Sequence, residues 1–170
     1  MSTLYYAGPL FTNAEREWNA ANAVILRARL AHMRVLVPQE FCAAFDADAS
    51  GKPRYDLIAK ACLDHLAQAT VMLAVLDGAD ADSGTCFEAG WAVARNIPVI
   101  GLRTDWRPAE DGAANCMLTR HCHAVVRSLD AAMKAIADVA AQTDHVHVTP
   151  VSSFLSTKQL NKSLPGVADR

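Results

Sequence analysis

Short apolar segments alternate along the chain with longer segments that carry apolar residues on one helical face. The short segments predict strands at Leu4–Ala7, Arg34–Val37, Val71–Leu76, Ile97–Leu102 and Ala124–Val126. Val71–Leu76 has no alternation of apolar and polar positions, which is typical of a strand buried on both faces of a parallel sheet.

The segments between these strands predict helices and two long loops. One helix follows a cap at Thr12 or Asn13. The next spans Asp56–Ala69, another carries Glu88, and the last begins at Ser128 or Asp130. The apolar faces of the first two are formed by Trp18, Val24, Ile25 and Leu30, and by Leu57, Ile58, Ala61, Cys62 and Leu66. Gln39–Arg54 and Thr104–Ala114 show no clear period and predict loops.

Strands that alternate with helices predict an α/β fold with right-handed crossovers. We expect a single-domain, flavodoxin-like (Rossmann-like) three-layer sandwich around a five-stranded parallel sheet. Residues 1–143 would form this domain. The tail 144–170 is rich in Ser, Thr, Lys and Pro, and we expect it to be disordered or packed on a neighbouring subunit.

Composition narrows the class of partner. Hydrophobic residues make up 52% of the 170 residues, which excludes a disordered protein, and the net charge is −2, from 16 basic and 18 acidic residues. No basic excess or Lys/Arg run indicates nucleic acid or a membrane surface, so we expect a small-molecule partner. The cysteine number is odd, without a CxxC pair. With no signal peptide predicted, this favours a reducing, cytoplasmic location.

Ligands of open α/β sheets bind beyond the carboxyl ends of the strands. This rule favours the loops Ala7–Asn13, Asp77–Thr85 and Thr104–Asn115. Glu88 follows the second loop and has two interpretations. In the first it closes a capping box with Thr85 and has no chemical role.

In the second interpretation, Glu88 is an ionised carboxylate near a helix N-terminus, as a glycosyl-transfer nucleophile must be. Gly84 and Gly90 would allow a ligand or a neighbouring backbone to approach closely. A second carboxyl group must then protonate the leaving group, and Asp64 and Asp82 are the two candidates.

Four motifs support the second interpretation. DSGTCFEAGWAVARNIPVIGLRTD, from Asp82, resembles the signature of the nucleoside 2'-deoxyribosyltransferase family. LYYAGPLF at the start of the chain and the segment from Asn115 to Leu118 also resemble segments of that family. Six residues separate Asp64 from the third strand, and Asp64 is at the position where the family has an aspartate. The four motifs lie in the family's order and cover about residues 4–140.

The resemblance implies a role for each matching residue. Glu88 matches the nucleophile, Tyr5 the tyrosine that orients it, and Asp64 the general acid and base. Tyr6 is the alternative to Tyr5, because a one-residue slip exchanges their faces. Six residues are candidates for substrate binding, either through the resemblance or through their position in the chain. They are Asp82, Gly8, Gly84, Gln39, Met117 and Asn115, the last from a neighbouring subunit.

The implied reaction is double displacement through a deoxyribosyl ester on Glu88, in nucleoside salvage. Its partners would be a 2'-deoxynucleoside, a free nucleobase and further copies of the chain, without a cofactor or metal. One alternative is a 2'-deoxynucleoside 5'-monophosphate N-glycosidase, and another is a non-catalytic nucleotide-binding module. Asp82 argues against the first because its charge would face the phosphate. The full set of site residues argues against the second.

The remaining features are possible metal ligands and possible contacts with the base. His121, Cys122 and His123 resemble metal ligands, but no further pair has zinc-type spacing, so we expect no metal site. Gln39 follows the second strand, where it could contact a base edge, and Trp106 could line the base pocket. Trp18 and Trp91 are interpreted as helix packing.

Overall fold

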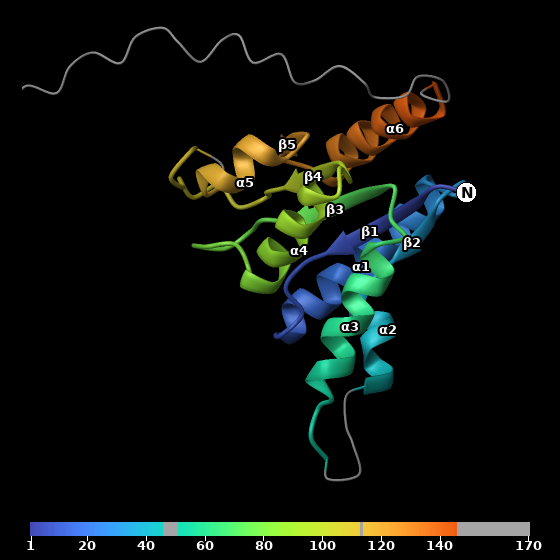
Figure 1. Cartoon of the computed structure of the whole chain (residues 1–170). Coiled ribbons are helices and arrows are strands. Elements are labelled where there is room, and N and C mark those ends of the chain that lie inside the picture. The colour runs from blue at the N-terminus through green and yellow to red at the C-terminus, as the bar shows by residue number, and fades with distance from the viewer. Residues whose placement is uncertain (46–50, 113, 146–170) are drawn as a thin grey trace, which may run out of the picture.

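The computed structural model describes residues 1–45, 51–112 and 114–145, the last three by their backbone alone. Helices and strands alternate along most of this length, as the sequence predicts (Figure 1). In chain order the elements are β1 (Thr3–Ala7), α1 (Asn13–Arg29), β2 (Arg34–Leu36), α2 (Pro38–Phe41), the 3₁₀ turn η1 (Cys42–Phe45), α3 (Tyr55–Leu66), β3 (Val71–Val75), α4 (Ser83–Ala94), β4 (Val99–Leu102), α5 (Cys116–His121), β5 (Ala124–Val126) and α6 (Leu129–His145).

The five strands form one sheet in the order β2-β1-β3-β4-β5, and every pair is parallel. This is the strand order of flavodoxin-like folds, in which ligands bind where the order reverses, between β1 and β3. The predicted α/β class and the five-stranded parallel sheet are therefore confirmed.

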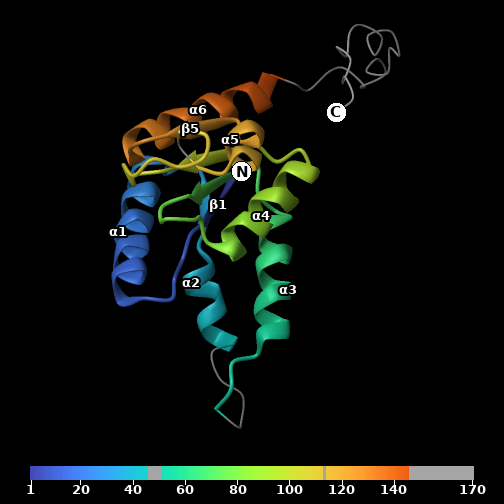
Figure 2. The same cartoon turned by 90° about the vertical axis from the view of Figure 1, so that its left-hand side faces the viewer.

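Helices cover both faces of the sheet and form the outer layers of the sandwich. Figure 2 shows α1 on one side of the molecule and α3 and α4 on the other. Leu4 and Tyr6 of β1 pack with α1 and α6 on one face. Tyr5 and Ala7 lie in the second core cluster, with α3 and α4. Neighbouring tyrosines thus enter opposite cores, as strand alternation requires.

Local signals explain where the helices begin and end. The Thr12 hydroxyl accepts a hydrogen bond from the Glu15 N–H at 3.2 Å, and the Glu15 carboxylate accepts one from the Thr12 N–H at 2.7 Å. This capping box starts α1 after Thr12, one of the two predicted caps. Asn96 follows the last residues of α4 with a φ of 58°, a left-handed conformation that ends helices and that Asn tolerates.

The structure differs from the sequence-based description at two places, and part of the predicted tail lies outside the described residues. Gln39–Arg54 is not wholly a loop, because α2 and η1 occupy residues 38–45. These turns are too short to show a helical period. Residues 116–121 form α5, which the sequence did not predict. The last helix continues to residue 145, and the division between domain and tail stays a prediction. Residues 146–170 lie outside the described part.

No helix in the described ranges is long and apolar enough to cross a membrane.

Candidate active site

The site is built around a hydrogen bond between strand β1 and helix α4. The Tyr5 hydroxyl donates to Oε1 of Glu88 at 2.7 Å, and the Tyr5 side chain is fully buried. Tyr6, the alternative, donates instead to Asn19 at 3.1 Å on the opposite side of the sheet. The pairing of Tyr5 with Glu88 is thus present in the structure, while its catalytic role stays a prediction.

Glu88 does not cap its helix. Asp82 is the N-cap residue of α4, and its Oδ2 accepts hydrogen bonds from the Thr85 N–H at 2.8 Å and the Thr85 hydroxyl at 3.0 Å. Because Thr85 is itself the capped N3 residue, the proposed Thr85–Glu88 capping box is wrong. Glu88 lies a full turn further into the helix, where the backbone N–H groups already have partners.

Different features around Glu88 shift its pKa in opposite directions. Burial raises the pKa of Glu88 above its ordinary value, and the negative charge of Asp82 acts in the same direction. Hydrogen bonds from Tyr5 and from the thiol of Cys62 lower that pKa again. A carboxylate that is buried yet held by the Tyr5 hydroxyl is a more basic nucleophile than an exposed one, and the Tyr5 hydrogen bond orients it.

Tyr5 remains a hydrogen-bond donor throughout the working pH range. Burial raises the pKa of Tyr5 far above that of a free phenol, and the charge of Glu88 raises it further. The phenol therefore keeps its proton and cannot act as an anion. The ring of Phe41, from α2, lies beside Tyr5 with the ring centroids 6.3 Å apart, and it helps to close this side of the site.

Asp64 is not brought to this cluster. It forms an ion pair with Lys60 on the surface of α3, and its side chain is 56% exposed. Cys62, two residues earlier, faces Tyr5 and Glu88. Residues two apart lie about 200° apart around a helix, so Asp64 points away from Glu88. The structure thus brings together Tyr5, Asp82 and Glu88 of the predicted residues, and it places Cys62 where an acid was expected.

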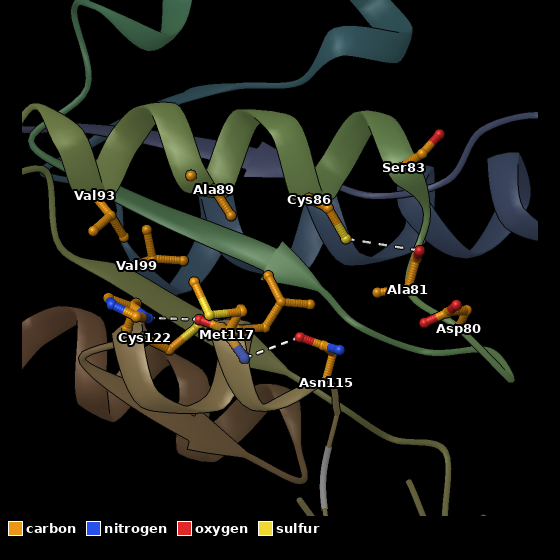
Figure 3. Close-up of a pocket in the computed structure, with 13 residues that line it drawn as sticks. Asp80, Ala81, Ser83, Cys86, Ala89, Val93, Val99, Asn115, Met117 and Cys122 are labelled. Atoms are coloured by element: carbon orange, nitrogen blue, oxygen red, sulfur yellow. Dashed lines mark hydrogen bonds between the residues drawn. The ribbon is translucent and has the colours of Figure 1, made fainter. Parts of the chain in front are cut away.

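A cavity of about 560 Å³ lies on the other side of α4 (Figure 3). Cys86, Ala89 and Val93 point into it from α4, and Met117 and Cys122 border it from the α5 side. Glu88 lies about 200° around the helix from Cys86. This cavity and the Tyr5–Glu88 pair therefore belong to opposite faces of the same helix.

Asn115 and Met117 border this cavity and not the Glu88 side. Asn115 caps α5 by accepting a hydrogen bond from the Met117 N–H at 2.9 Å, and its Nδ2 donates to Glu110 at 2.8 Å. Within one chain, α4 stands between Asn115 and Glu88. An Asn115 that serves a Glu88 site would therefore have to serve that of another copy.

The remaining predicted residues lie in four different parts of the structure. A Cβ on Gly8 would lie 3.0 Å from Val75 Cγ2, so a side chain there would crowd the ends of β1 and β3. A Cβ on Gly84 would lie 3.2 Å from the capping oxygen of Asp82. Gln39 donates to the Arg16 carbonyl at 3.0 Å, and its Oε1 is buried without a hydrogen-bond partner among the described residues. Trp106 is 93% exposed.

Two residues near the site were not predicted from the sequence. Cys62 was assigned to the apolar face of its helix, which is correct, but that face meets the polar Tyr5–Glu88 pair. Arg103 is 1% exposed and donates to the carbonyls of Gly78, at 3.1 Å, and Leu76. It holds the β3–α4 loop that leads to Asp82. A charged residue directly after an apolar strand was the available signal.

The structure does not test the predicted absence of a metal site. His121 ends α5, and its Nδ1 lies 2.8 Å from the Met117 carbonyl. Within the described ranges, no three His, Cys, Asp or Glu side chains are grouped to hold a metal ion.

One family profile matches most of the chain. The sequence profile described as nucleoside 2-deoxyribosyltransferase matches residues 4–133. A conserved protein from Enterococcus faecalis is similar in structure, with a TM-score of 0.71 and 27% identity over 81% of this chain and 98% of its own.

Two solved structures named as 2-deoxyribosyltransferases share the fold. The enzyme from Bacillus psychrosaccharolyticus has a TM-score of 0.66 and 20% identity, covering 81% of this chain and 96% of its own. The enzyme from Leishmania mexicana has a TM-score of 0.56 and 22% identity, covering 87% and 100%. None of the curated proteins compared with the chain matches it.

Proposed function

The chain belongs to the nucleoside 2-deoxyribosyltransferase family, and from this premise we propose that it transfers a 2'-deoxyribosyl group between nucleobases with Glu88 as the nucleophile. Membership supports an enzyme that transfers a glycosyl group or hydrolyses a glycosidic bond, with nucleoside and nucleobase substrates. The transfer reaction and its covalent course are the proposal. The observation that carries it is the buried hydrogen bond of 2.7 Å from Tyr5 to Glu88.

The proposed reaction has two displacements at the anomeric carbon. In the first, a Glu88 oxygen forms a bond to C1' while the bond from C1' to the departing base breaks, and the base takes up a proton from Asp64 or from water. In the second, a nitrogen of the incoming base attacks C1', the ester bond breaks, Glu88 regains its charge, and the incoming base gives up its N–H proton to the same group. Tyr5 uses one Glu88 oxygen, Oε1, so Oε2 is the oxygen that we assign to the attack.

Asp82 is the carboxylate that we place against the sugar. Both of its hydrogen bonds to Thr85 end on Oδ2. Its other oxygen can accept a hydrogen bond from a sugar hydroxyl. Besides burial, the charge of Asp82 raises the pKa of Glu88, so the two carboxylates lie in the same region. A 5'-phosphate dianion in that region would meet two carboxylates, which favours a substrate with a free 5'-hydroxyl.

Gln39 is proposed to contact the base. Its buried Oε1 has no partner in the described part of the chain, and a buried acceptor of this kind costs free energy unless a ligand or water bonds to it. Asp64 is retained only as a residue to be tested, since the position facing Glu88 from α3 belongs to Cys62. Asn115 is proposed to act in the site of a neighbouring copy, because α4 separates it from Glu88 of its own chain.

One incubation tests the function. Deoxyinosine or thymidine is mixed with adenine and the protein, and the products are separated by chromatography. Transfer predicts deoxyadenosine, and much less sugar release when adenine is omitted. The same assay with deoxyinosine 5'-monophosphate tests the role of Asp82. Equal release of free base from the monophosphate, with or without adenine, would replace the transferase by the N-glycosidase.

A further inference from the structure

A second cavity, of about 350 Å³, lies on the α1 side of the sheet, at the carboxyl ends of the strands. Its border includes residues that directly follow β1, β3 and β4, which are Pro9, Asp77 and Thr104. Val75 also borders it and belongs to the core cluster beneath α1 and α6, whereas Tyr5 belongs to the cluster on the other face. The carboxyl edge of such a sheet is where ligands bind, and the volume is that of a small-molecule site.

An aromatic side chain borders this cavity. Trp18 comes from α1 and was interpreted from the sequence as helix packing, but it is 36% exposed and lies at the edge of the cavity. Pro9, Ala14 and Val75 add apolar surface. Among aromatic side chains, an indole that a ligand can reach attracts cations most strongly, because its ring face is the negative end of a quadrupole.

The charges around the cavity have one sign. Glu15, in the first turn of α1, and Asp77, after β3, both border it, and none of the described residues on its border is Lys, Arg or His. The hydrogen bond from the Thr12 N–H holds the pKa of Glu15 below its ordinary value, so Glu15 is ionised at neutral pH. The cavity therefore disfavours anions such as nucleotides and favours a cation.

The hydrogen bonds of the two carboxylates narrow the class of cation. Oδ1 of Asp77 accepts from the N–H groups of Thr104 and Asp105, at 2.6 and 2.8 Å, and Oδ2 accepts from the Thr104 hydroxyl. Oε2 of Glu15 accepts from two backbone N–H groups at the start of α1, at 2.9 and 2.7 Å. Three of the four carboxylate oxygens thus already accept hydrogen bonds, so the pair offers a ligand its charge more than new hydrogen bonds.

We propose that this cavity binds an organic cation of the quaternary ammonium class, with its methyl groups against Trp18 and its charge near Glu15 and Asp77. A quaternary ammonium has no N–H group to satisfy, and its methyl groups match the apolar surface of Pro9 and Val75. A primary ammonium would lose a strong hydration shell that the occupied oxygens cannot replace. The site does not depend on the proposed transfer reaction, so its failure would leave that proposal unchanged.

The probe is choline, and the control ligand is 3,3-dimethylbutan-1-ol, a neutral molecule of nearly the same shape. The chain has three tryptophans, and the ¹H–¹⁵N signal of the Trp18 indole is assigned by its absence in Trp18→Phe. Chemical-shift changes of the indole signals locate the bound ligand. Affinity is measured by titration calorimetry at constant ionic strength, because salt screens exposed charges.

Four variants separate the contributions of charge and aromatic face. Glu15→Gln removes a charge while its amide can still close the capping box of α1. Glu17→Gln, at an exposed position of the same helix, is the matched control. Trp18→Leu keeps an apolar side chain without the ring, and Trp18→Phe restores an aromatic face. Thermal unfolding checks that each variant is folded.

We expect choline to shift the Trp18 signal saturably and to leave the other two indole signals in place. Its affinity should fall by about threefold to tenfold in Glu15→Gln and in Trp18→Leu, and less in Trp18→Phe. Glu17→Gln should bind choline as wild type does, and the neutral alcohol should bind more weakly than choline.

Four results would overturn the proposal. They are the absence of a saturable Trp18 shift, equal binding of choline and the neutral alcohol, an unchanged choline affinity in Glu15→Gln, and an equal loss of affinity in Glu17→Gln. If Trp18→Leu does not fold, Trp18→Phe and Glu15→Gln decide the question, since neither removes both the aromatic face and the charge.

Discussion

Replacing Glu88 by Gln separates a chemical role from a structural one, because the amide has nearly the same shape. The Tyr5 hydroxyl can still donate to the amide oxygen, but the acceptor is neutral. A hydrogen bond to a charged group contributes about 1.5–3 kcal/mol and a neutral one about 0.5–1.5 kcal/mol, so the exchange costs about 1 kcal/mol. The neutral amide also avoids the cost of burying the Glu88 charge, which raises the free energy of unfolding. We therefore expect a folded variant whose free energy of unfolding lies within about 1 kcal/mol of wild type.

The pH dependence of that stability has a definite sign. Burial raises the pKa of Glu88 in the folded protein. Between the ordinary and the raised value, the folded state holds more protons than the unfolded state, so wild-type stability falls as pH rises through this window. Glu88→Gln lacks this dependence. Its stability relative to wild type should therefore increase from acid to neutral pH, as measured by denaturant unfolding at several pH values.

The rate should respond quite differently. An amide cannot form the sugar ester, so base exchange should fall by at least about a thousandfold, as loss of a nucleophile does in other enzymes. Glu17→Gln, at an exposed position of α1, is the matched control and should exchange normally. Near-normal exchange by Glu88→Gln would refute the nucleophile role. Loss of stability by more than about 3 kcal/mol would refute the reasoning about packing.

Three further outcomes follow from the geometry. Tyr5→Phe removes the donor at 2.7 Å from Glu88 and should slow exchange by about tenfold to a hundredfold, with its acid limb at higher pH; an unchanged rate and profile would contradict this. Asp64→Asn should change exchange by less than about threefold, since it breaks only a surface ion pair with Lys60, whereas a hundredfold loss would identify Asp64 as the acid. Mixed oligomers of Glu88→Ala and Asn115→Ala should regain part of the activity that each variant lacks, and no recovery would mean that Asn115 does not act across subunits.

The sequence predicts the sheet better than it predicts the site. Apolar runs such as Val71–Leu76 report burial directly, and all five strands lie where such segments were found. Helix α5 was missed because six residues are too few to show a period, and its cap, Asn115, was interpreted for its chemistry instead. Periodicity works over several turns, whereas short helices depend on one or two capping bonds.

The site was predicted in part, for a related reason. Tyr5 and Glu88 are far apart in the sequence, and their pairing followed from a motif match, which fixed the face of β1 correctly. Asp64 was chosen because it is a carboxylate at nearly the right distance from the next strand. On a helix, a shift of two residues turns a side chain to the opposite face, so the structure does not bring Asp64 to Glu88, and its role as the acid stays a prediction. Only the packing of α3 against α4 shows that Cys62 is the residue that faces Glu88.

The two faces of helix α4 have different surroundings, and this difference is relevant to how copies of the chain could assemble. One face presents Glu88 to Tyr5 and Cys62, while the opposite face lines the cavity of about 560 Å³ beside α5. Between them, Phe87 is 64% exposed, and Met117 across the cavity is 66% exposed. Both side chains would be covered if another copy of the chain packed on this face. A second copy that covers them would also bring its own Asn115 toward this region, and a closed two-fold pair would do so for both sites at once.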